Sequence, residues 1–93
     1  MHFVWDEVKS RSNLRKHGIS FETGSLVFDD PLHVIRQDRA VAGEARWQAI
    51  GMVNGSLMLF VAHTIEDEDN ELIRIISARK ATARERRVYE EQA

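Results

Sequence analysis

The chain has 93 residues, of which 43% are hydrophobic and 30% charged, which is typical of one soluble globular domain with a single core. It contains no cysteine, which excludes disulfides, and its longest apolar run, 57–62, is too short to span a bilayer. Its N-terminus lacks the pattern of a signal peptide, so we expect a cytoplasmic protein. A net charge of −2 argues against a uniformly basic nucleic-acid binder.

The N-terminal third predicts a strand followed by two helices. Residues 2–5 are typical of a short strand, and Asp6 is placed to cap a helix over 7–17 that ends before Gly18. Ser20 is expected to cap a second helix over 21–29, with Phe21 and Phe28 on its apolar face. Pro31 then stops this helix, because the residue before a proline is disfavoured in the α region.

The rest of the chain predicts β structure and a last helix. We expect strands over 32–37, 45–53, 57–64 and 72–79, with a loop over 38–43 and an acidic turn over 66–71. Asn54-Gly55 indicates a two-residue hairpin. Thr82 and Glu85 have the spacing of a capping box that begins a helix ending near residue 92. We summarise this as an α+β fold, helices on one antiparallel sheet, in the order β-α-α-β-β-β-α.

The charges are unevenly distributed. Residues 66–71 hold five acidic side chains, and without them 13 basic residues stand against 10 acidic ones. The basic residues then fall into two clusters, which are Lys9, Arg11, Arg15 and Lys16 followed by His17, and Arg74, Arg79, Lys80, Arg84, Arg86 and Arg87. The chain therefore has the means to present a basic face to a polyanion.

Several short motifs, in order and at characteristic spacing, cover nearly the whole chain. They are Trp5-Asp6 with Lys9, NLRKHGISF over 13–21, VFDDP over 27–31, GEARW over 43–47 with Ile50-Gly51, Thr64, RIISARKA over 74–81, Glu85-Arg86 and Tyr89. In these motifs the chain resembles the BrnT toxins. The resemblance implies a RelE-like ribonuclease toxin of a type II toxin–antitoxin system, which cleaves RNA, free or ribosome-associated, and so inhibits translation. It also implies a ribbon-helix-helix, BrnA-like antitoxin, through which alone the complex binds DNA. The slightly acidic net charge departs from many ribonuclease toxins, which are basic.

Metal-free RNA cleavage needs a base for the ribose 2′-hydroxyl, positive charge for the phosphate in the transition state, and an acid for the leaving oxygen. Arg46, Arg74 and Arg79 are the candidates for the positive charge, since an arginine fork grips two phosphate oxygens. In a regular strand Arg74 and Arg79 would lie on opposite faces, so one shared site needs a bend or bulge near Ser77. Each arginine is equally explained by a salt bridge or by solvation.

Further candidates come from the same motifs. His17 and Glu44 are candidate acid–base residues, although His17 is also suited to capping its helix and Glu44 to pairing with Arg46. Arg15, Lys16, Lys80 and Tyr89 are candidate RNA contacts, with packing the alternative for Tyr89. We expect Trp5, Trp47, Phe21 and Phe28 in the core.

Other classes of function are less well supported. His2, His33 and His63 form no i, i+4 pair, so neither a metal site nor another cofactor is expected. The chain also has no glycine-rich phosphate loop and no nucleophile elbow. Two alternatives to a ribonuclease stay open: a non-catalytic module that binds RNA or protein, and a degenerate toxin that acts as a co-repressor with its antitoxin.

Overall fold

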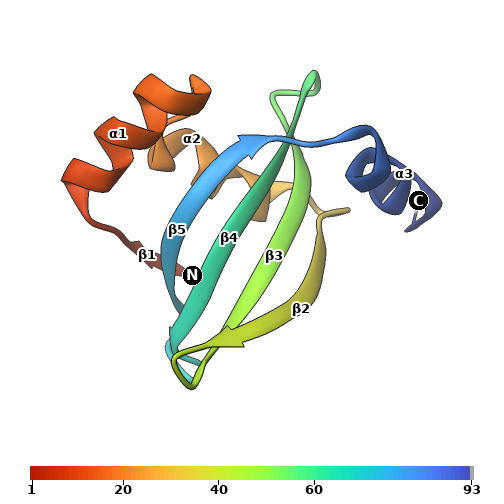
Figure 1. Ribbon diagram of the computed structural model, residues 1–93. Helices are drawn as coiled ribbons and strands as arrows, with labels where there is room; N and C mark the ends of the chain where they lie inside the picture. Colours follow the sequence, from red (N-terminus) through yellow and green to blue (C-terminus); the bar gives the residue numbers. More distant parts are fainter. Residues whose placement is uncertain (93) are drawn as a thin grey trace.

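Five strands form one mixed sheet with helices on both sides. The computed structural model describes residues 1–92 and gives, in chain order, β1 (His2–Val4), α1 (Glu7–His17), α2 (Phe21–Ser25), a 3-10 turn η1 (Leu26–Asp29), β2 (Val34–Val41), β3 (Glu44–Val53), β4 (Leu57–Asp67), β5 (Leu72–Lys80) and α3 (Ala83–Gln92). The strand order is β1-β5-β4-β3-β2. Figure 1 shows α1 and α2 on the β5 side of the molecule and α3 beside β2 and β3. No helix within residues 1–92 is long and apolar enough to cross a membrane.

The α+β class is as predicted, but two details of the expected sheet are wrong. The order β-α-α-β-β-β-α omitted one of the four strands that follow the first two helices. The sheet is also not purely antiparallel, because β1 pairs in parallel with β5, with Phe3 opposite Ile73. The physical reason is that β4 occupies one edge of β5 and leaves the other edge free over 72–74. The N-terminal strand fills that edge before the chain turns into α1.

Local signals fixed most helix ends. Asp6 accepts hydrogen bonds from the N–H groups of Val8 and Lys9, and Gly18 ends α1 at φ 74°, as predicted. Ser20 caps α2 through the N–H of Thr23. The helix expected over 21–29 is however interrupted, and its second half is the 3-10 turn η1. Gly24 and Ser25 are weak helix formers, and the Ser25 hydroxyl donates to the carbonyl of Glu22, which favours a tightened turn.

The strand boundaries differ from the prediction mainly at β2. Asn54-Gly55 forms the predicted hairpin, with both residues at positive φ. The expected loop over 38–43 is a second two-residue turn, since Ala42 and Gly43 both have positive φ and β2 continues to Val41. The strand begins at Val34 rather than Leu32, because the Asp30 carboxylate holds the N–H of Leu32 in a turn. β4 extends to Asp67 and takes up part of the expected acidic turn.

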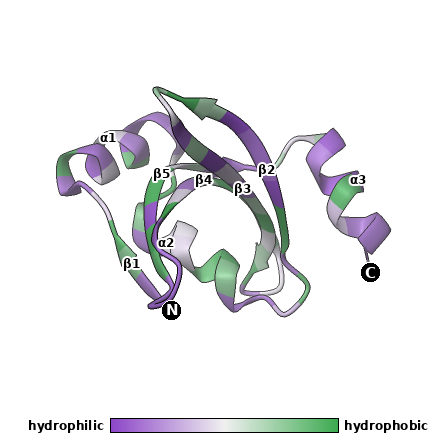
Figure 2. Cartoon of the chain, turned by 90° about the horizontal axis from the view of Figure 1, so that it is seen from below, coloured by the Kyte–Doolittle hydropathy of each residue, from purple (hydrophilic) through white to green (hydrophobic). Residues whose placement is uncertain are grey.

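The main core lies between α2–η1 and one face of the sheet, here called the core face. It is formed by the buried residues Ile19, Phe21, Val27, Phe28, Ala49, Val53, Leu59, Val61, Ile73, Ile75 and Ala78. Figure 2 shows the strands curving around α2 on this face. Gly24 permits the close approach, because a Cβ there would stand 2.9 Å from the Cβ of Ala78. Phe21 and Phe28 are buried as predicted, whereas Trp5 and Trp47 are only half-buried.

A buried histidine belongs to the same core. His63 is 1% exposed and its ring meets that of Phe28 edge-on at a centroid distance of 5.1 Å. Burial lowers the pKa of His63 to about 4, because the charged imidazolium would be poorly solvated there. His63 is therefore a neutral core residue at physiological pH.

Candidate functional site

The opposite face of the sheet, here called the polar face, carries all three predicted arginines. On β4, Phe60 lies opposite Arg79 and Thr64 lies opposite Arg74. Phe60 and Thr64 are four residues apart on β4, so they and their partners point to the same face. This is possible because Ile76 is an extra residue on β5: Ile75 pairs with His63 and Ser77 with Ala62. The bulge that the sequence left open is therefore present, next to Ser77.

Arg46 reaches the polar face by simple alternation along β3. Gln48 pairs with Ala62 and Ile50 with Phe60, and Arg46 precedes Gln48 by two residues. The Nε of Arg46 is buried and has no hydrogen-bond partner among residues 1–92, and the same holds for the Oγ1 of Thr64. Buried donors are rarely left unpaired, since each such group costs roughly 1–3 kcal/mol. These two atoms mark the part of the polar face where buried polar groups of residues 1–92 are left without a partner.

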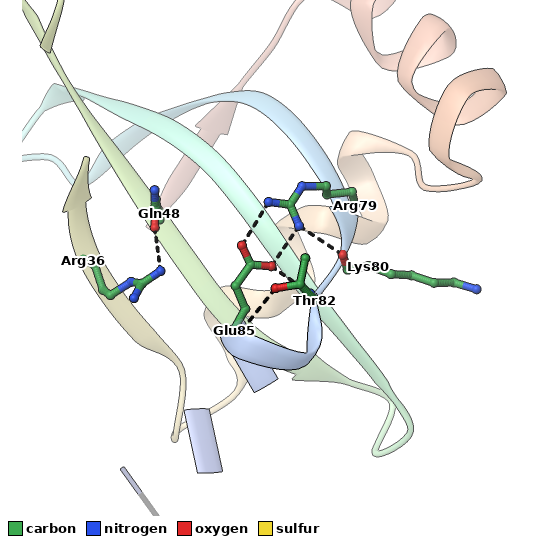
Figure 3. A network of polar contacts seen from close by, with 6 residues as sticks. All are labelled: Arg36, Gln48, Arg79, Lys80, Thr82 and Glu85. Carbon is green, nitrogen blue, oxygen red and sulfur yellow. Dashed lines mark hydrogen bonds and ion pairs between the residues drawn. The ribbon is translucent and has the colours of Figure 1, made fainter. Parts of the chain in front are cut away.

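Arg79 is engaged with the C-terminal helix. Its two terminal nitrogens donate to the two carboxylate oxygens of Glu85 at 2.8 and 2.9 Å (Figure 3). Its guanidinium also lies 4.0 Å from the ring centre of Phe60. The hydrogen bond to Glu85 raises the pKa of Arg79. Burial would raise the pKa of Glu85, but the bonds from Arg79 and Thr82 outweigh it and lower that pKa. Arg79 and Glu85 are thus charged partners.

Glu85 performs two tasks at once. Its carboxylate accepts from the N–H of Thr82, while the Thr82 hydroxyl accepts from the N–H of Glu85. The predicted capping box is thereby confirmed. Because the same carboxylate holds Arg79, the start of α3 is attached to β5 on the polar face. A second cluster, Ile50, Met58 and Phe60 with Val88 and Tyr89 of α3 packed against it, covers the neighbouring part of this face.

The remaining polar-face side chains are more exposed. Arg74 forms an ion pair with Glu66. Arg36 donates to the amide oxygen of Gln48 at 2.9 Å, also drawn in Figure 3. A hydrogen bond from Gln48 lowers the pKa of Asp38. Glu44 lies on the parity of Arg46 but at the hairpin end of β3, where it is exposed. The polar face is therefore a mixed surface in which two of the three arginines already have carboxylate partners.

The other predicted residues lie elsewhere. Arg15, Lys16 and His17 are exposed in the last turn of α1, beyond the β5 edge of the sheet. Lys80 is exposed at the end of β5. The hydroxyl of Tyr89 donates to Asp30 at 2.7 Å, and its ring packs on the cluster under α3. The structure thus places Arg46, Arg74 and Arg79 on one face of the sheet and leaves the α1 residues separate.

Sequence reasoning missed the polar residues between the arginines. Thr64, Gln48 and Ser77 lie on the polar face and were given no role. A signal for Thr64 was available, because it is one of the motif residues in which the chain resembles the BrnT toxins. The side chain is only 1% exposed. No group of three or more histidine, aspartate or glutamate side chains in the described part of the chain is placed to hold a metal ion.

Comparisons with known proteins found a family model and a solved structure that are similar to this chain. A family model described as the ribonuclease toxin BrnT of type II toxin–antitoxin systems matches residues 5–85. Among solved structures, the fold is similar to the crystal structure of the Brucella abortus ribonuclease toxin BrnT, with 27% identity, coverage of 88% of this chain and 97% of that one, and a TM-score of 0.63. The comparison with curated protein sequences gave no match. The matched range includes all three arginines and ends at Glu85.

Proposed function

The chain belongs to the BrnT family of ribonuclease toxins from type II toxin–antitoxin systems, and from this premise we propose that it cleaves RNA on the polar face without a metal ion. The observation that carries the proposal is the pair of unpartnered buried donors, Arg46 Nε and Thr64 Oγ1, on a face that also holds Arg74 and Arg79. A phosphodiester that binds the guanidinium of the half-buried Arg46 supplies acceptor oxygens beside these enclosed atoms. Cleavage of cytoplasmic RNA in this way would inhibit translation.

The reaction that suits such a face is an internal phosphoryl transfer. The ribose 2′-oxygen attacks phosphorus and loses its proton to a base, while the bond from phosphorus to the 5′-oxygen breaks and that oxygen takes up a proton from water. Arg46 and Arg74 bind the non-bridging oxygens, whose negative charge grows in the transition state. Glu44, two residues from Arg46 on the same strand face, is the proposed base. Arg79 adds positive charge and holds α3 in place through Glu85.

The direct test is incubation of the purified, antitoxin-free protein with RNA in excess EDTA. We expect cleavage to continue at an unchanged rate and to leave a 2′,3′-cyclic phosphate and a 5′-hydroxyl, because no step passes through a metal. The ends are identified by their reactivity toward phosphatase and polynucleotide kinase. Loss of cleavage in EDTA would contradict the metal-free mechanism while leaving the ribonuclease assignment intact.

A second candidate function has one observation in its favour. Arg74 and Arg79 are each paired with a carboxylate, as structural arginines are. A degenerate toxin that only completes a repressor complex would keep such pairs. Two results together would favour that function over cleavage. RNA would stay intact at high protein concentration, and the antitoxin would bind its operator more tightly in the presence of this protein.

The partner is a cognate antitoxin, as for any toxin of a type II system. We propose that the antitoxin is a ribbon-helix-helix protein that covers the polar face and provides the DNA contacts of the complex. The RelE-like character of the fold also stays a prediction.

The gene for this protein is expected to adjoin, normally on its downstream side, a short reading frame for a ribbon-helix-helix protein. The reason is that toxin and antitoxin are made together. Co-expression of the two frames should yield a stable complex that does not cleave RNA. A neighbouring frame of another fold that nevertheless blocks cleavage would contradict the antitoxin type and leave the toxin assignment untouched.

A further inference from the structure

A second polar site lies outside the polar face, between α1 and β5. A pocket of about 220 Å³ is lined by Lys9, Ser12, Asn13, Lys16, His17, Ile76 and Ser77. Its lining offers two lysines, an imidazole and two hydroxyls, and includes no carboxylate. Such a set of donors suits an anion with several oxygens, a phosphate above all.

The way α1 is attached explains why these residues face one another. The two aliphatic residues of α1, Val8 and Leu14, are 65% and 48% exposed, so the helix does not dock by an apolar stripe. The buried side chains are instead Ser10 and Asn13. The amide of Asn13 donates to the carbonyls of Ile19 and Ala78, both at 2.7 Å, and accepts from the N–H of Ala78. This clamp fixes one side of α1 against the edge of β5 at Ala78, beyond the stretch that pairs with β1.

The helical repeat then places the cations at the same edge. Lys9, Ser12, Asn13 and Lys16 follow one another at spacings of three, one and three residues, which keeps them on one side of α1. Asn13 is held on β5, so its neighbours along that side flank the strand next to the Ile76 bulge. Figure 1 shows α1 beside β5 in this arrangement. The pocket is a consequence of polar docking, not a gap left by poor packing.

The bulge also connects the pocket to the polar face. Ser77 lines the pocket and lies opposite Ala62 on the polar face, between Arg74 and Arg79 in the sequence. A linear polyanion held on the polar face can therefore continue over the edge of β5 into the pocket. We infer that the pocket between α1 and β5 binds a phosphodiester of the RNA that flanks the scissile one. This inference rests on the proposed function and adds a second contact point for the same strand.

The test is the binding of a 2′-O-methyl RNA oligonucleotide, which the proposed reaction cannot cleave, at several salt concentrations. The double variant Lys9→Gln/Lys16→Gln should bind about ten-fold more weakly than the wild type at low salt. Its plot of log affinity against log salt should lose about 0.7 of its slope, the share of one single-strand phosphate contact. Both lysines are exposed, so the fold should be unaffected; thermal unfolding checks this.

A matched control removes the same charge elsewhere. Arg11→Gln/Arg84→Gln takes two exposed cations from outside the pocket and should leave the salt slope unchanged. With cleavable RNA, the pocket variant should raise KM and keep kcat, because it leaves the polar face intact. An affinity and slope equal to those of the control would overturn the inference even where cleavage is normal. A pocket variant that binds RNA normally but its antitoxin weakly would also overturn it, since the pocket would then hold an acidic partner.

The two proposals can fail separately. Failure of the proposed function is absence of cleavage by the wild type, whereas failure of the inference is unchanged binding of the non-cleavable oligonucleotide by the pocket variant. A wild type that binds RNA with the predicted slope but never cuts it would leave the pocket as a phosphate site on a non-catalytic RNA-binding protein.

Discussion

Replacing Arg46 with methionine is expected to lower kcat/KM for RNA cleavage by about 10- to 1000-fold, the range for losing one charged contact to the transition state. Stability should stay constant or increase. The variant keeps most of the aliphatic stem and removes a buried Nε that has no partner in residues 1–92, so unfolding no longer gains the solvation of that group. Single-turnover cleavage rates and urea unfolding measure the two quantities on the same preparation.

Arg46→Met is expected to lower activity while stability stays constant or increases, and this combination makes it more informative than the other variants. Replacing an arginine with a purely structural role should lower the free energy of unfolding. We expect this for Arg79→Ala, because it leaves the carboxylate of Glu85 without its partner. Arg74→Met should lose less activity than Arg46→Met, since Arg74 is already paired with Glu66. Arg87→Met, an exposed change in α3, controls for net charge. Normal cleavage by a stable Arg46→Met protein would remove Arg46 from the mechanism.

The parts of the fold that follow from adjacent residues were predictable. The caps at Asp6 and Ser20, the Asn54-Gly55 hairpin and the Thr82–Glu85 capping box each depend on groups within a few residues of one another. The parallel pairing of β1 with β5 joins positions 70 residues apart, such as Phe3 and Ile73, and the clamp of Asn13 on Ala78 joins positions 65 residues apart. No periodicity encodes such pairings, so they were missed.

In the candidate site too, features set by neighbouring residues were predictable and features set by strand pairing were not. Alternation placed Arg46 on one face of β3, but whether Arg74 and Arg79 share a face depends on one extra residue in β5. The sequence hints at it, because Ile76 is a second apolar residue directly after the alternating run Ile73-Arg74-Ile75. Only one of Ile75 and Ile76 can enter the core. Ile75 does so, since it pairs with the buried His63 and is 2% exposed, whereas Ile76 lines the pocket between α1 and β5. A bulge is thus suggested by the sequence and located by the structure.

The second large effect concerns stability in acid. The free energy of unfolding is expected to be constant near neutral pH and to fall by about 3 kcal/mol as the pH decreases from 6.5 to 4. In the unfolded chain His63 has its ordinary pKa of 6.5, whereas burial lowers the pKa to about 4 in the folded protein. Between these values the unfolded state binds the proton and the folded state does not, so acid favours unfolding. Urea unfolding at a series of pH values measures the slope.

The histidine can be separated from the carboxylates by the pH at which each acts. Hydrogen bonds lower the pKa values of Asp30 and Glu85 against the effect of burial, so the stabilising effect of these groups is complete above their ordinary pKa values of 3.8 and 4.5 and is lost as the pH falls through the lower pKa values of the folded state. The variant His63→Phe keeps an aromatic ring against Phe28 and cannot titrate, and it should abolish the slope between pH 6.5 and 4. The exposed His2→Gln change should leave the slope intact. A slope that persists in His63→Phe would assign the acid sensitivity to another group and place the imidazole of His63 in contact with water.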